Sequence, residues 1–325
     1  MASKRLVLID TDGGVDDALA LLLALRSPEL EVVAITTVAG NVDVDKAVRN
    51  ALLLVDIAGS VSRPPVAVGA EGPLEGEPVR AEYVHGSDGL GGLWNLKSPD
   101  GSPKYHPPSK GPSEEGAVEA ILKACRKYGV DLTIIALGPL TNLALALEKD
   151  PEALRGVRKV VVLGGAISVH GNITPVSEFN IYSDPKAARA VFEAGLPLVL
   201  LPLDVVYKVV LPRRRLEEHA REHPSKLTQF LLDCTRKYFE FHREWEGVDG
   251  CYLADPLAVG FVLDEGLFKV EPMRVEVETE GRLTCGMTVA DRRPPRYREG
   301  ESPNALVCTD VDAEGFLSLF LERLG

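Results

Sequence analysis

Cysteine is scarce in this sequence and never occurs in closely spaced pairs. Only five of the 325 residues are cysteines. They are Cys125, Cys234, Cys251, Cys285 and Cys308. A disulfide framework usually has an even number of cysteines, and a zinc knuckle needs C-x-x-C pairs. The sequence therefore speaks against both, and we expect these cysteines to be reduced and structural.

Long apolar segments, internal repeats and low-complexity tracts are also missing. No apolar run approaches the roughly 20 residues that a membrane-spanning helix needs. The first residues, Met1–Arg5, are followed by only a few apolar residues before Asp10, which is too short for the core of a signal peptide. We therefore expect a soluble, cytoplasmic protein without a membrane partner.

Basic residues are outnumbered by acidic ones. The chain has 36 lysines and arginines against 48 aspartates and glutamates, which gives a formal net charge of −12 at pH 7. A surface field of this sign repels phosphate backbones. The composition thus excludes a nucleic-acid polymer as the expected partner and favours a neutral or cationic small molecule.

Strand patterns alternate with helix patterns along the chain. With 45% hydrophobic and 26% charged residues, the chain can bury a substantial core. We expect strands at 6–9, 32–37, 66–68, 132–137, 159–163, 198–201, 275–277 and 305–308, and helices at 16–26, 44–57, 114–128, 140–148, 185–193, 216–243 with a break at Pro224, and 313–324. This alternation predicts an α/β fold with a mainly parallel sheet covered on both faces.

One long segment, residues 70–112, has the composition of a loop. It is dense in glycine and proline, includes "HGSDGLGGLWN" from His85 to Asn95, and is longer than most connections in compact domains. Long loops of this kind often carry function. We therefore expect it to form a flexible lid beside a site.

Four carboxylates are concentrated in the stretch "LVLIDTDGGVDDALALLLAL", between a strand pattern and a helix pattern. The period of a strand places Asp10 and Asp12 on one face, and the two glycines that follow permit a tight turn toward Asp16 and Asp17. Like charges this close destabilise a fold unless a cation or a helix N-terminus compensates them. A hard divalent cation is the natural partner of such a cluster.

Two known arrangements of clustered aspartates compete with this interpretation. An EF-hand loop that starts at Asp10 would need Glu at its twelfth position, where the chain has Leu21. A strand followed by D-x-D also resembles the haloacid-dehalogenase-like phosphatases, in which the first aspartate is the nucleophile. That superfamily usually continues with Thr or Ser and an apolar residue where this chain has Gly14 and Val15. The phosphatase is therefore the alternative function.

Three further segments make a resemblance specific: "AITTVAGNVDVDKAVRNA" (34–51), "GGAISVHGNITPVSEFNIYSDPKAA" (164–188) and "LTCGMTVADRRPP" (283–295). Together with "DTDGGVDDALA" they resemble the nucleoside hydrolase family over nearly the whole chain. The resemblance implies a single α/β domain, residues 1–325, with a Rossmann-like, open and mainly parallel sheet. It also implies calcium-dependent hydrolysis of ribonucleosides to ribose and free base by a homodimer or homotetramer.

The resemblance assigns roles to individual residues. Asp12, Asp17, Asp255 and the backbone carbonyl of Leu137 match the calcium ligands, and Asp12 also matches the general base that activates the attacking water. Positions that hold the ribose or lie near the substrate are matched by Asp16, Asn41, His85, Asn172, Glu178 and Asn180. Carboxylates and amides suit a neutral polyol because they accept and donate hydrogen bonds in fixed directions.

The sequence departs from the family where the leaving base would be protonated. Many members have a histidine directly before the aspartate of "DP", and this chain has Ala254. His242, in the helical segment 213–250 that we expect near the site, is the candidate replacement acid. Alternatively, aromatic side chains stack on the base, with Phe179, Tyr238, Trp94 and Trp245 as candidates. Loss of the acid would also fit a catalytically weak protein that binds ribose or nucleosides.

Overall fold

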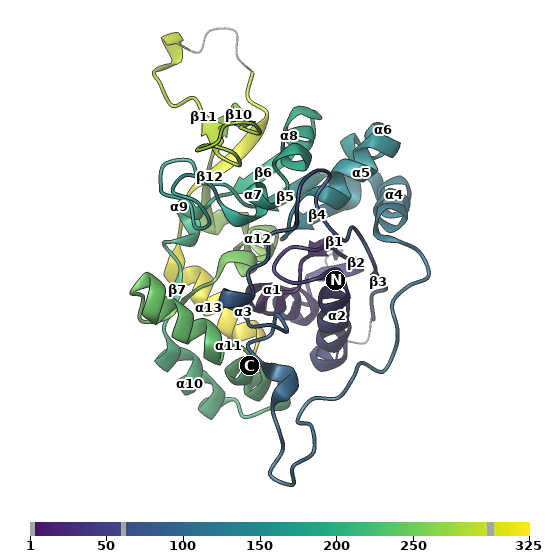
Figure 1. Ribbon diagram of the computed structural model, residues 1–325, viewed down its shortest axis with the longest axis vertical. Coiled ribbons are helices and arrows are strands. Elements are labelled where there is room, and N and C mark those ends of the chain that lie inside the picture. The colour runs from purple at the N-terminus through teal and green to yellow at the C-terminus, as the bar shows by residue number, and fades with distance from the viewer. Residues whose placement is uncertain (1–3, 60–62, 298–301) are drawn as a thin grey trace.

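The computed structural model describes residues 4–59, 63–297 and 302–325. Its centre is an eight-stranded sheet in the order β3-β2-β1-β4-β5-β6-β12-β9 (Figure 1). The strands are β1 (Arg5–Thr11), β2 (Leu30–Thr37), β3 (Val66–Ala67), β4 (Leu132–Ala136), β5 (Lys159–Leu163), β6 (Leu198–Leu201), β9 (Phe268–Met273) and β12 (Ala305–Val311). All neighbours pair in parallel except β12 and β9, which are antiparallel. The predicted α/β fold with a mainly parallel sheet is confirmed.

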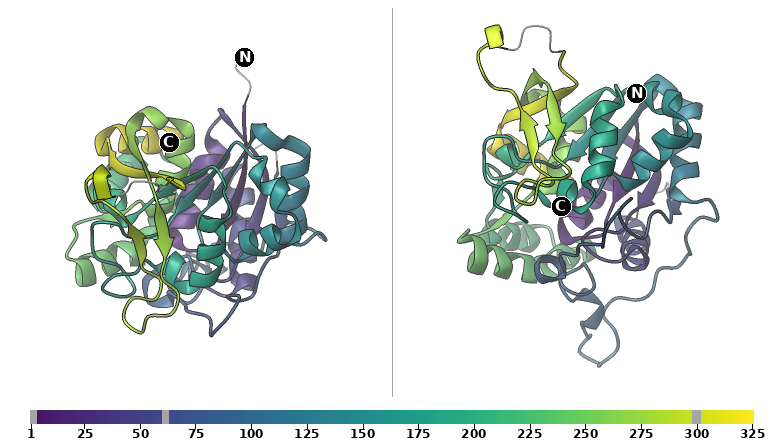
Figure 2. Two further views of the ribbon diagram at one scale, coloured as in Figure 1. Left: turned by 90° about the horizontal axis from the view of Figure 1, so that it is seen from above. Right: turned by 45° about the horizontal axis from the view of Figure 1, so that its top comes forward.

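Helices cover both faces of this sheet (Figures 1 and 2). The helices in the described residues are α1 (Val15–Arg26), α2 (Val44–Ala58), α3 (Glu82–His85), α4 (Ala117–Tyr128), α5 (Thr141–Lys149), α6 (Pro151–Arg155), α7 (Phe179–Ser183), α8 (Pro185–Glu193), α9 (Leu203–Val206), α10 (Arg213–Glu222), α11 (Lys226–Phe241), α12 (Ala254–Leu263) and α13 (Ala313–Arg323). Of these, α3 and α10 pack on α11. Alternate residues of β1 lie on opposite faces of the sheet, since Val7 and Ile9 belong to one hydrophobic cluster and Leu8 to the other.

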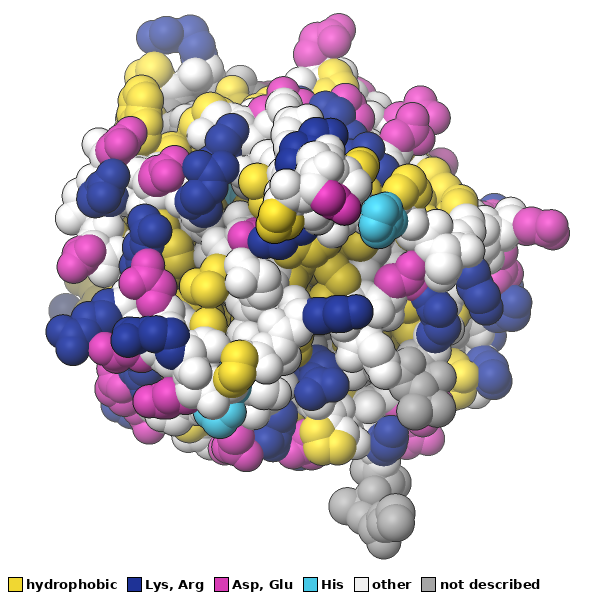
Figure 3. Space-filling model, turned by 90° about the horizontal axis from the view of Figure 1, so that it is seen from below, with side chains coloured by type: hydrophobic (Ala, Val, Ile, Leu, Met, Phe, Trp, Pro, Cys, Tyr) yellow, Lys and Arg dark blue, Asp and Glu magenta, His cyan; other side chains and the backbone are white. Residues whose placement is uncertain are grey.

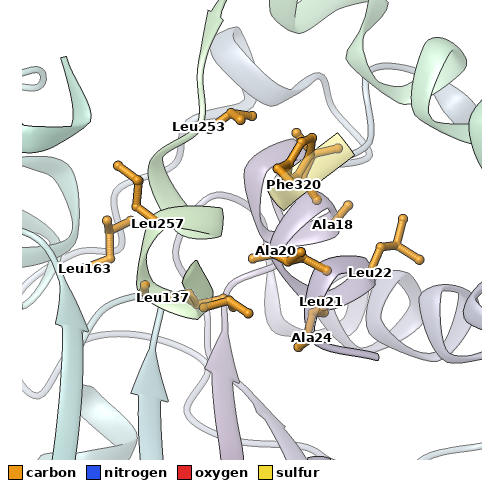
Figure 4. Packing of buried hydrophobic residues seen from close by; sticks show 14 of the residues in the cluster. Ala18, Ala20, Leu21, Leu22, Ala24, Leu137, Leu163, Leu253, Leu257 and Phe320 are labelled. Carbon is orange, nitrogen blue, oxygen red and sulfur yellow. The ribbon is translucent and has the colours of Figure 1, made fainter. Parts of the chain in front are cut away.

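Helix α1 lies in the larger of the two clusters. Its residues from Val15 to Ala24 are all buried, because α1 packs against the sheet on one side and against α11, α12 and α13 on the other. Figure 4 shows residues of α1, among them Ala18, Leu21 and Leu22, in one cluster with Leu137, Leu257 and Phe320. A helix that is apolar all round is stable in such surroundings. Its buried position holds its N-terminus in place beside the end of β1.

The segment 70–112 is tied to the body of the protein at several points. The backbone N–H groups of Ala70 and Leu74 donate to Asn142 and Asp184, at 2.9 and 2.8 Å. Asn50 of α2 donates to the carbonyl of Asp88 at 2.8 Å and accepts the indole N–H of Trp94 at 3.0 Å. The segment also contains α3, which lies beside the pocket described below. Its place therefore fits the expected lid, and its motion stays a prediction.

Charges of both signs are mixed on the surface. On the face drawn in Figure 3, basic and acidic side chains alternate around patches of hydrophobic ones. Two small antiparallel pairs complete the described structure: β7 (Val210–Leu211) with β8 (Cys251–Tyr252), and β10 (Val275–Val277) with β11 (Thr288–Ala290). None of the described helices has both the length and the apolar character that crossing a membrane would require.

Candidate active site

A pocket opens where the carboxyl ends of β1, β4, β5 and β6 meet, the usual place for a site in an open parallel sheet. Its empty volume is about 840 Å³, including the opening to solvent. The predicted residues that line it are Asp16, Asn41, His85, Leu137, Asn172, Glu178, Phe179, Asn180, Tyr238, His242 and Asp255. The fold thus brings together side chains from segments more than 200 residues apart in the sequence.

Asp12 follows the last residue of β1 and is fully buried. Its two carboxylate oxygens accept hydrogen bonds from Asn41, from the backbone N–H at 2.7 Å and from the side-chain amide at 2.9 Å. Two glycines leave room for it, because a Cβ on Gly40 would lie 2.1 Å from Asp12 Oδ2 and one on Gly138 would lie 2.9 Å from Asp12 Cβ. Asp12 is therefore held in one orientation.

Asp16 and Asp17 occupy the first turn of α1 and point to different partners. Gly13, with φ at +79°, makes the left-handed turn that leads into the helix. Asp17 accepts hydrogen bonds from the hydroxyl of Thr11 and the backbone N–H of Gly14. Asp16 accepts from the hydroxyl of Tyr238 at 3.3 Å and faces the pocket. After this tight turn, the two neighbouring carboxylates therefore bind different partners.

Asp255, in the first turn of α12, completes a cluster of buried acids. One oxygen from each of Asp16, Asp17 and Asp255 lies within 4.8 Å of the others, and no ion pair formed by the described residues brings a lysine or arginine to them. Burial, followed by the charges of Asp16 and Asp17, raises the pKa of Asp255 well above its usual range. Burial and the charge of Asp17 likewise raise the pKa of Asp12, and that of Asp16 to about 7. An added divalent cation would relieve this repulsion.

The other predicted ligand lies beside this cluster. The carbonyl of Leu137, directly after β4, lines the pocket and accepts a hydrogen bond from the amide of Asn180 at 2.7 Å. A carbonyl oxygen has a second lone pair, so this bond leaves room for one more partner. The structure thus groups Asp17 and Asp255 with Asp16, whereas both oxygens of Asp12 are bonded to Asn41. Asp12 and Asp17 are buried and are not among the lining residues of the pocket. The role of Asp12, Asp17, Leu137 and Asp255 as ligands stays a prediction.

Glu178 and Asn172 shape the loop between β5 and α7. Glu178 is the N-cap of α7, and its carboxylate accepts backbone N–H groups of Gly165, Asn180 and Ile181. Burial nevertheless raises its pKa. The side-chain oxygen of Asn172 accepts the N–H of Phe179 at 2.8 Å. These side chains are thus fixed by backbone groups at the pocket wall, where a ribose could meet their remaining donors and acceptors.

The β10–β11 hairpin supports this loop from behind. The hydroxyl of Thr288 accepts the N–H of Ala166 and donates to its carbonyl, both at 2.9 Å, and the hydroxyl of Ser177 donates to the carbonyl of Cys285. Gly286 is in contact with α7, because a Cβ there would lie 2.7 Å from Tyr182 Cα. The segment 283–295, which carries part of the family resemblance, therefore supports the loop that contains Asn172 and Glu178.

This contact yields a testable expectation for Thr288→Val. Valine matches the shape of threonine but leaves the N–H and carbonyl of Ala166 unpaired, which costs about 1–3 kcal/mol. Urea unfolding should show that loss, and kinetics should show a raised KM because the loop carries two predicted ribose contacts. Thr288→Ser, which keeps the hydroxyl, serves as the control. A Thr288→Val protein with unchanged KM and stability would show that Thr288 does not support this loop.

The opposite end of the pocket is lined by α3 and the C-terminal end of α11. The rings of His85 and Tyr238 stack at 5.5 Å, and a π-helical turn at His242–Glu246 places His242 against Tyr238 at 4.4 Å between ring centres. His242 Nδ1 lies 2.8 Å from the carbonyl of Tyr238. A carbonyl only accepts, so Nδ1 carries the proton and Nε2 is the atom left for other partners. Burial lowers the pKa of both histidines to about 4.

Several residues at this end have no signal in the sequence that we could have used. Tyr83, Tyr207, Phe241, Glu246 and Tyr252 all line the pocket. They come from three segments that are far apart along the chain, and a single tyrosine in a loop does not indicate a site. Only the folded arrangement brings them together.

The two tryptophans lie elsewhere. Trp245 is 79% exposed and stacks on Phe241, with 6.4 Å between ring centres, outside the residues that line the pocket. Trp94 packs against the core, donates its indole N–H to Asn50 at 3.0 Å and lies under the guanidinium of Arg49. Among the candidates for stacking on a base, Phe179 and Tyr238 are the two that the structure places in the pocket.

Asp10, the nucleophile of the phosphatase alternative, is fully buried below the pocket. Its Oδ1 accepts hydrogen bonds from Thr36 at 2.5 Å and Asn142 at 2.8 Å, and it is not among the lining residues. Burial raises its pKa to about 7. Asp10 also lies outside the group formed by Asp16, Asp17 and Asp255, and its Oδ1 is bonded to side chains of β2 and α5, so the geometry does not favour phosphoryl transfer to Asp10.

Comparison with known proteins finds relatives that match nearly the whole chain. The family model described as inosine-uridine preferring nucleoside hydrolase matches residues 7–318. The pyrimidine-specific ribonucleoside hydrolase RihA of Salmonella paratyphi B is 40% identical over 322 residues, which cover 98% of this chain and 97% of that protein. RihA of Citrobacter koseri is 41% identical with the same coverage.

Solved structures show the same fold. A purine-preferring ribonucleoside hydrolase from Gardnerella vaginalis superposes with a TM-score of 0.89 at 32% identity, and the plant nucleoside hydrolase PpNRh1 with 0.88 at 35%, each over 98% of both chains. Both the sequence match and the superposition extend over almost the full length. The chain therefore belongs to the inosine-uridine preferring nucleoside hydrolase family, whose members are enzymes that hydrolyse ribonucleosides.

Proposed function

We propose that this ribonucleoside hydrolase depends on Ca²⁺ held by Asp12, Asp17, Asp255 and the Leu137 carbonyl. The observation that carries the proposal is the group of buried carboxylates at the pocket floor, with no lysine or arginine paired to them among the described residues. The imidazole of His85 lies 3.7 Å from Asp16, and burial lowers its pKa to about 4. Three like charges without a counter-charge are costly in a buried site. A divalent cation would offset that cost.

The chemistry of the donors favours a hard cation. Carboxylates and a carbonyl supply only oxygen, and Ca²⁺ takes six to eight oxygen ligands in a flexible shell, some of which could be substrate hydroxyls. The nearest imidazole, His85, uses Nδ1 to accept the N–H of Val15 at 3.1 Å. That nitrogen is therefore unavailable to a softer metal such as zinc.

The residues of the chain have distinct parts in the proposed reaction. A bound divalent cation would act as a Lewis acid and stabilise negative charge at the pocket floor. Asp12, held by Asn41, accepts a proton from the attacking water as the bond between C1′ and the base breaks. Asp16, Asn172, Glu178 and Asn180 hold the ribose hydroxyls. The acidic surroundings stabilise the positive charge that develops on the ribose ring.

The preferred base can be a purine or a pyrimidine. The Salmonella relative is named pyrimidine-specific, whereas the Gardnerella enzyme of the same fold is named purine-preferring. The lining residues Phe179 and Tyr238 offer rings that could stack on either. A panel of ribonucleosides scored by released reducing sugar measures the preference directly.

Removal of metal tests the proposed dependence. Dialysis against a chelator should reduce hydrolysis of uridine or inosine to the background rate, and Ca²⁺ should restore it more effectively than Mg²⁺, which demands a tighter octahedral shell. Because Ca²⁺ would bind only the folded protein, a free concentration of 100 times Kd should raise the free energy of unfolding by about 2.7 kcal/mol.

A matched pair of variants localises the site. Asp255→Asn should weaken Ca²⁺ binding at least about tenfold, because it removes one charged ligand. Asp249→Asn removes an exposed acid a few residues before α12 and should leave Ca²⁺ binding unchanged. Full activity after exhaustive chelation, or equal Ca²⁺ affinity in both variants, would overturn the proposal.

A further inference from the structure

Asn50, on α2, is a polar side chain to which the proposed reaction gives no part. It is fully buried and is not among the residues that line the pocket. Its Nδ2 donates hydrogen bonds to the backbone carbonyls of Gly13 at 3.0 Å and Asp88 at 2.8 Å. Its Oδ1 accepts the indole N–H of Trp94 at 3.0 Å. A single side chain thus links α2 to the turn 12–17 and to the stretch 85–95 of the long loop segment.

These two pieces of chain contribute different groups to the site. The turn 12–17 contains Asp12 and Asp17, two of the proposed cation ligands, and the stretch 85–95 begins with His85, which lines the pocket. They are joined directly where the N–H of Val15 donates to His85 Nδ1 at 3.1 Å. Because Nδ1 accepts this bond, the ring is neutral and Nε2 carries its proton. The direction of this N–H therefore depends on how the stretch 85–95 lies against the turn.

The stretch 85–95 is packed closely against both the turn and α11. A Cβ on Gly89, where φ is +78°, would lie 2.4 Å from the carbonyl oxygen of Gly13. A Cβ on Gly91, where φ is +70°, would lie 2.4 Å from the carbonyl oxygen of Cys234 on α11. Only glycine allows backbones to approach each other this closely. A shift of the turn therefore also shifts the stretch, since hardly any space separates the two.

We propose that Asn50 is a positioning residue that couples the cation site to the stretch 85–95. The inference rests on the proposed function, because it takes the turn 12–17 as part of a Ca²⁺ site. A cation bound to the carboxylates of Asp12 and Asp17 would restrict the turn between them, which includes Gly13. Asn50 holds the carbonyls of Gly13 and Asp88 together, so the same cation stabilises the stretch 85–95 as well.

Hydrogen exchange in the wild-type protein, followed by mass spectrometry, measures this coupling. Amides that exchange by local opening report the stability of their own segment. Addition of Ca²⁺ should slow exchange in peptides that cover the turn 12–17. It should also slow exchange in peptides that cover the stretch 85–95 at least about fivefold, the low end of coupling between sites. Peptides of α6, which contributes no residue to the pocket, should exchange at an unchanged rate.

Two variants separate Asn50 from the rest of its hydrogen-bonded cluster. Asn50→Ala removes all three hydrogen bonds, whereas Trp94→Phe removes only the indole donor and leaves both donors of Asn50 in place. In Asn50→Ala, Ca²⁺ should still slow exchange in the turn 12–17 but not in the stretch 85–95. In Trp94→Phe, it should slow exchange in both. If Asn50→Ala does not fold, Asn50→Asp, which has nearly the same size and lacks the amide donors, takes its place.

Kinetics with saturating Ca²⁺ give a second measure of the role of Asn50. Asn50→Ala should raise KM for uridine about two- to tenfold, the equivalent of one hydrogen bond to the substrate, because His85 is no longer held in place. The change in kcat should be smaller, since Asp12 keeps its own bonds to Asn41. Trp94→Phe should leave KM unchanged. A loss of stability alone would lower the amount of folded enzyme and would not change KM.

Each outcome supports or overturns the coupling. Slower exchange in the turn 12–17 but not in the stretch 85–95 of the wild-type protein would overturn it and leave the proposed function intact. No effect of Ca²⁺ on either segment would overturn both. Protection of the stretch that persists in the Asn50 variant, or that is lost equally in Trp94→Phe, would show that Asn50 is not the coupling residue.

Discussion

Asp12→Asn is expected to lower kcat about 10²–10⁴-fold, the usual contribution of general-base catalysis. An asparagine amide cannot take a proton from the attacking water. The change is close to isosteric, and Asn41 can still contact the side-chain oxygen. The KM for uridine should change much less, because the predicted ribose contacts belong to other residues. Steady-state kinetics at several Ca²⁺ concentrations measures both parameters.

Saturating Ca²⁺ is needed because Asp12 is also a proposed ligand. A variant that recovers wild-type kcat when the Ca²⁺ concentration is raised has lost affinity for the metal and has not lost its general base. Near-normal turnover of Asp12→Asn under those conditions would exclude Asp12 as the base. A low kcat that persists at saturation, with an unchanged unfolding curve, would support its assignment.

The second large effect concerns His242. If His242 protonates a neutral leaving base, His242→Ala should slow hydrolysis of uridine or inosine about 10²–10⁴-fold. The same change should hardly affect a p-nitrophenyl riboside, whose leaving group departs as a stable anion. Comparison of the two substrates separates an acid from a residue that shapes the pocket. Equal losses on both substrates would mean damage to ribose binding or to the fold.

The pKa of His242 gives the sign of the pH dependence. Burial lowers this pKa to about 4, so at neutral pH only a small protonated fraction could act as an acid. That fraction grows about tenfold for each unit by which the pH falls toward 4. The rate on uridine divided by the rate on the p-nitrophenyl riboside should therefore rise as the pH falls, because groups common to both reactions cancel. A ratio independent of pH would contradict the acid role.

The sequence predicted most of the sheet and missed a central helix. Buried parallel strands are short apolar runs bounded by turn residues, and these were found where the structure has β1, β2, β4, β5 and β6. Helix α12 was missed because "ADPLAVGFVL" is apolar on all sides and has no helical period. Strand β9 was missed for the opposite reason, since "FKVEPM" has four exposed residues and a proline.

The candidate site shows a similar division. Asp16, in the first turn of α1, and Glu178, the N-cap of α7, could be predicted because each lies in a motif that carries the family resemblance. At the end of α11, the predicted position in the pocket was right for His242 and wrong for Trp245, because the π-helical turn brings His242 to the pocket and leaves Trp245 on the surface. The order in which aromatic residues surround a pocket depends on contacts between distant segments, for which one sequence carries no local signal.

The pocket has two ends that come from different parts of the fold. Its floor is formed at the tips of the central strands, under buried hydrogen bonds that leave little freedom for substitution. Its mouth is formed by a four-residue helix, the last turn of α11 and single tyrosines, many of them partly exposed. Mutations at the mouth can therefore change which base is accepted without touching the groups that cleave the bond. Such independence would let one scaffold diversify into enzymes with different base preferences while its hydrolytic chemistry stays the same.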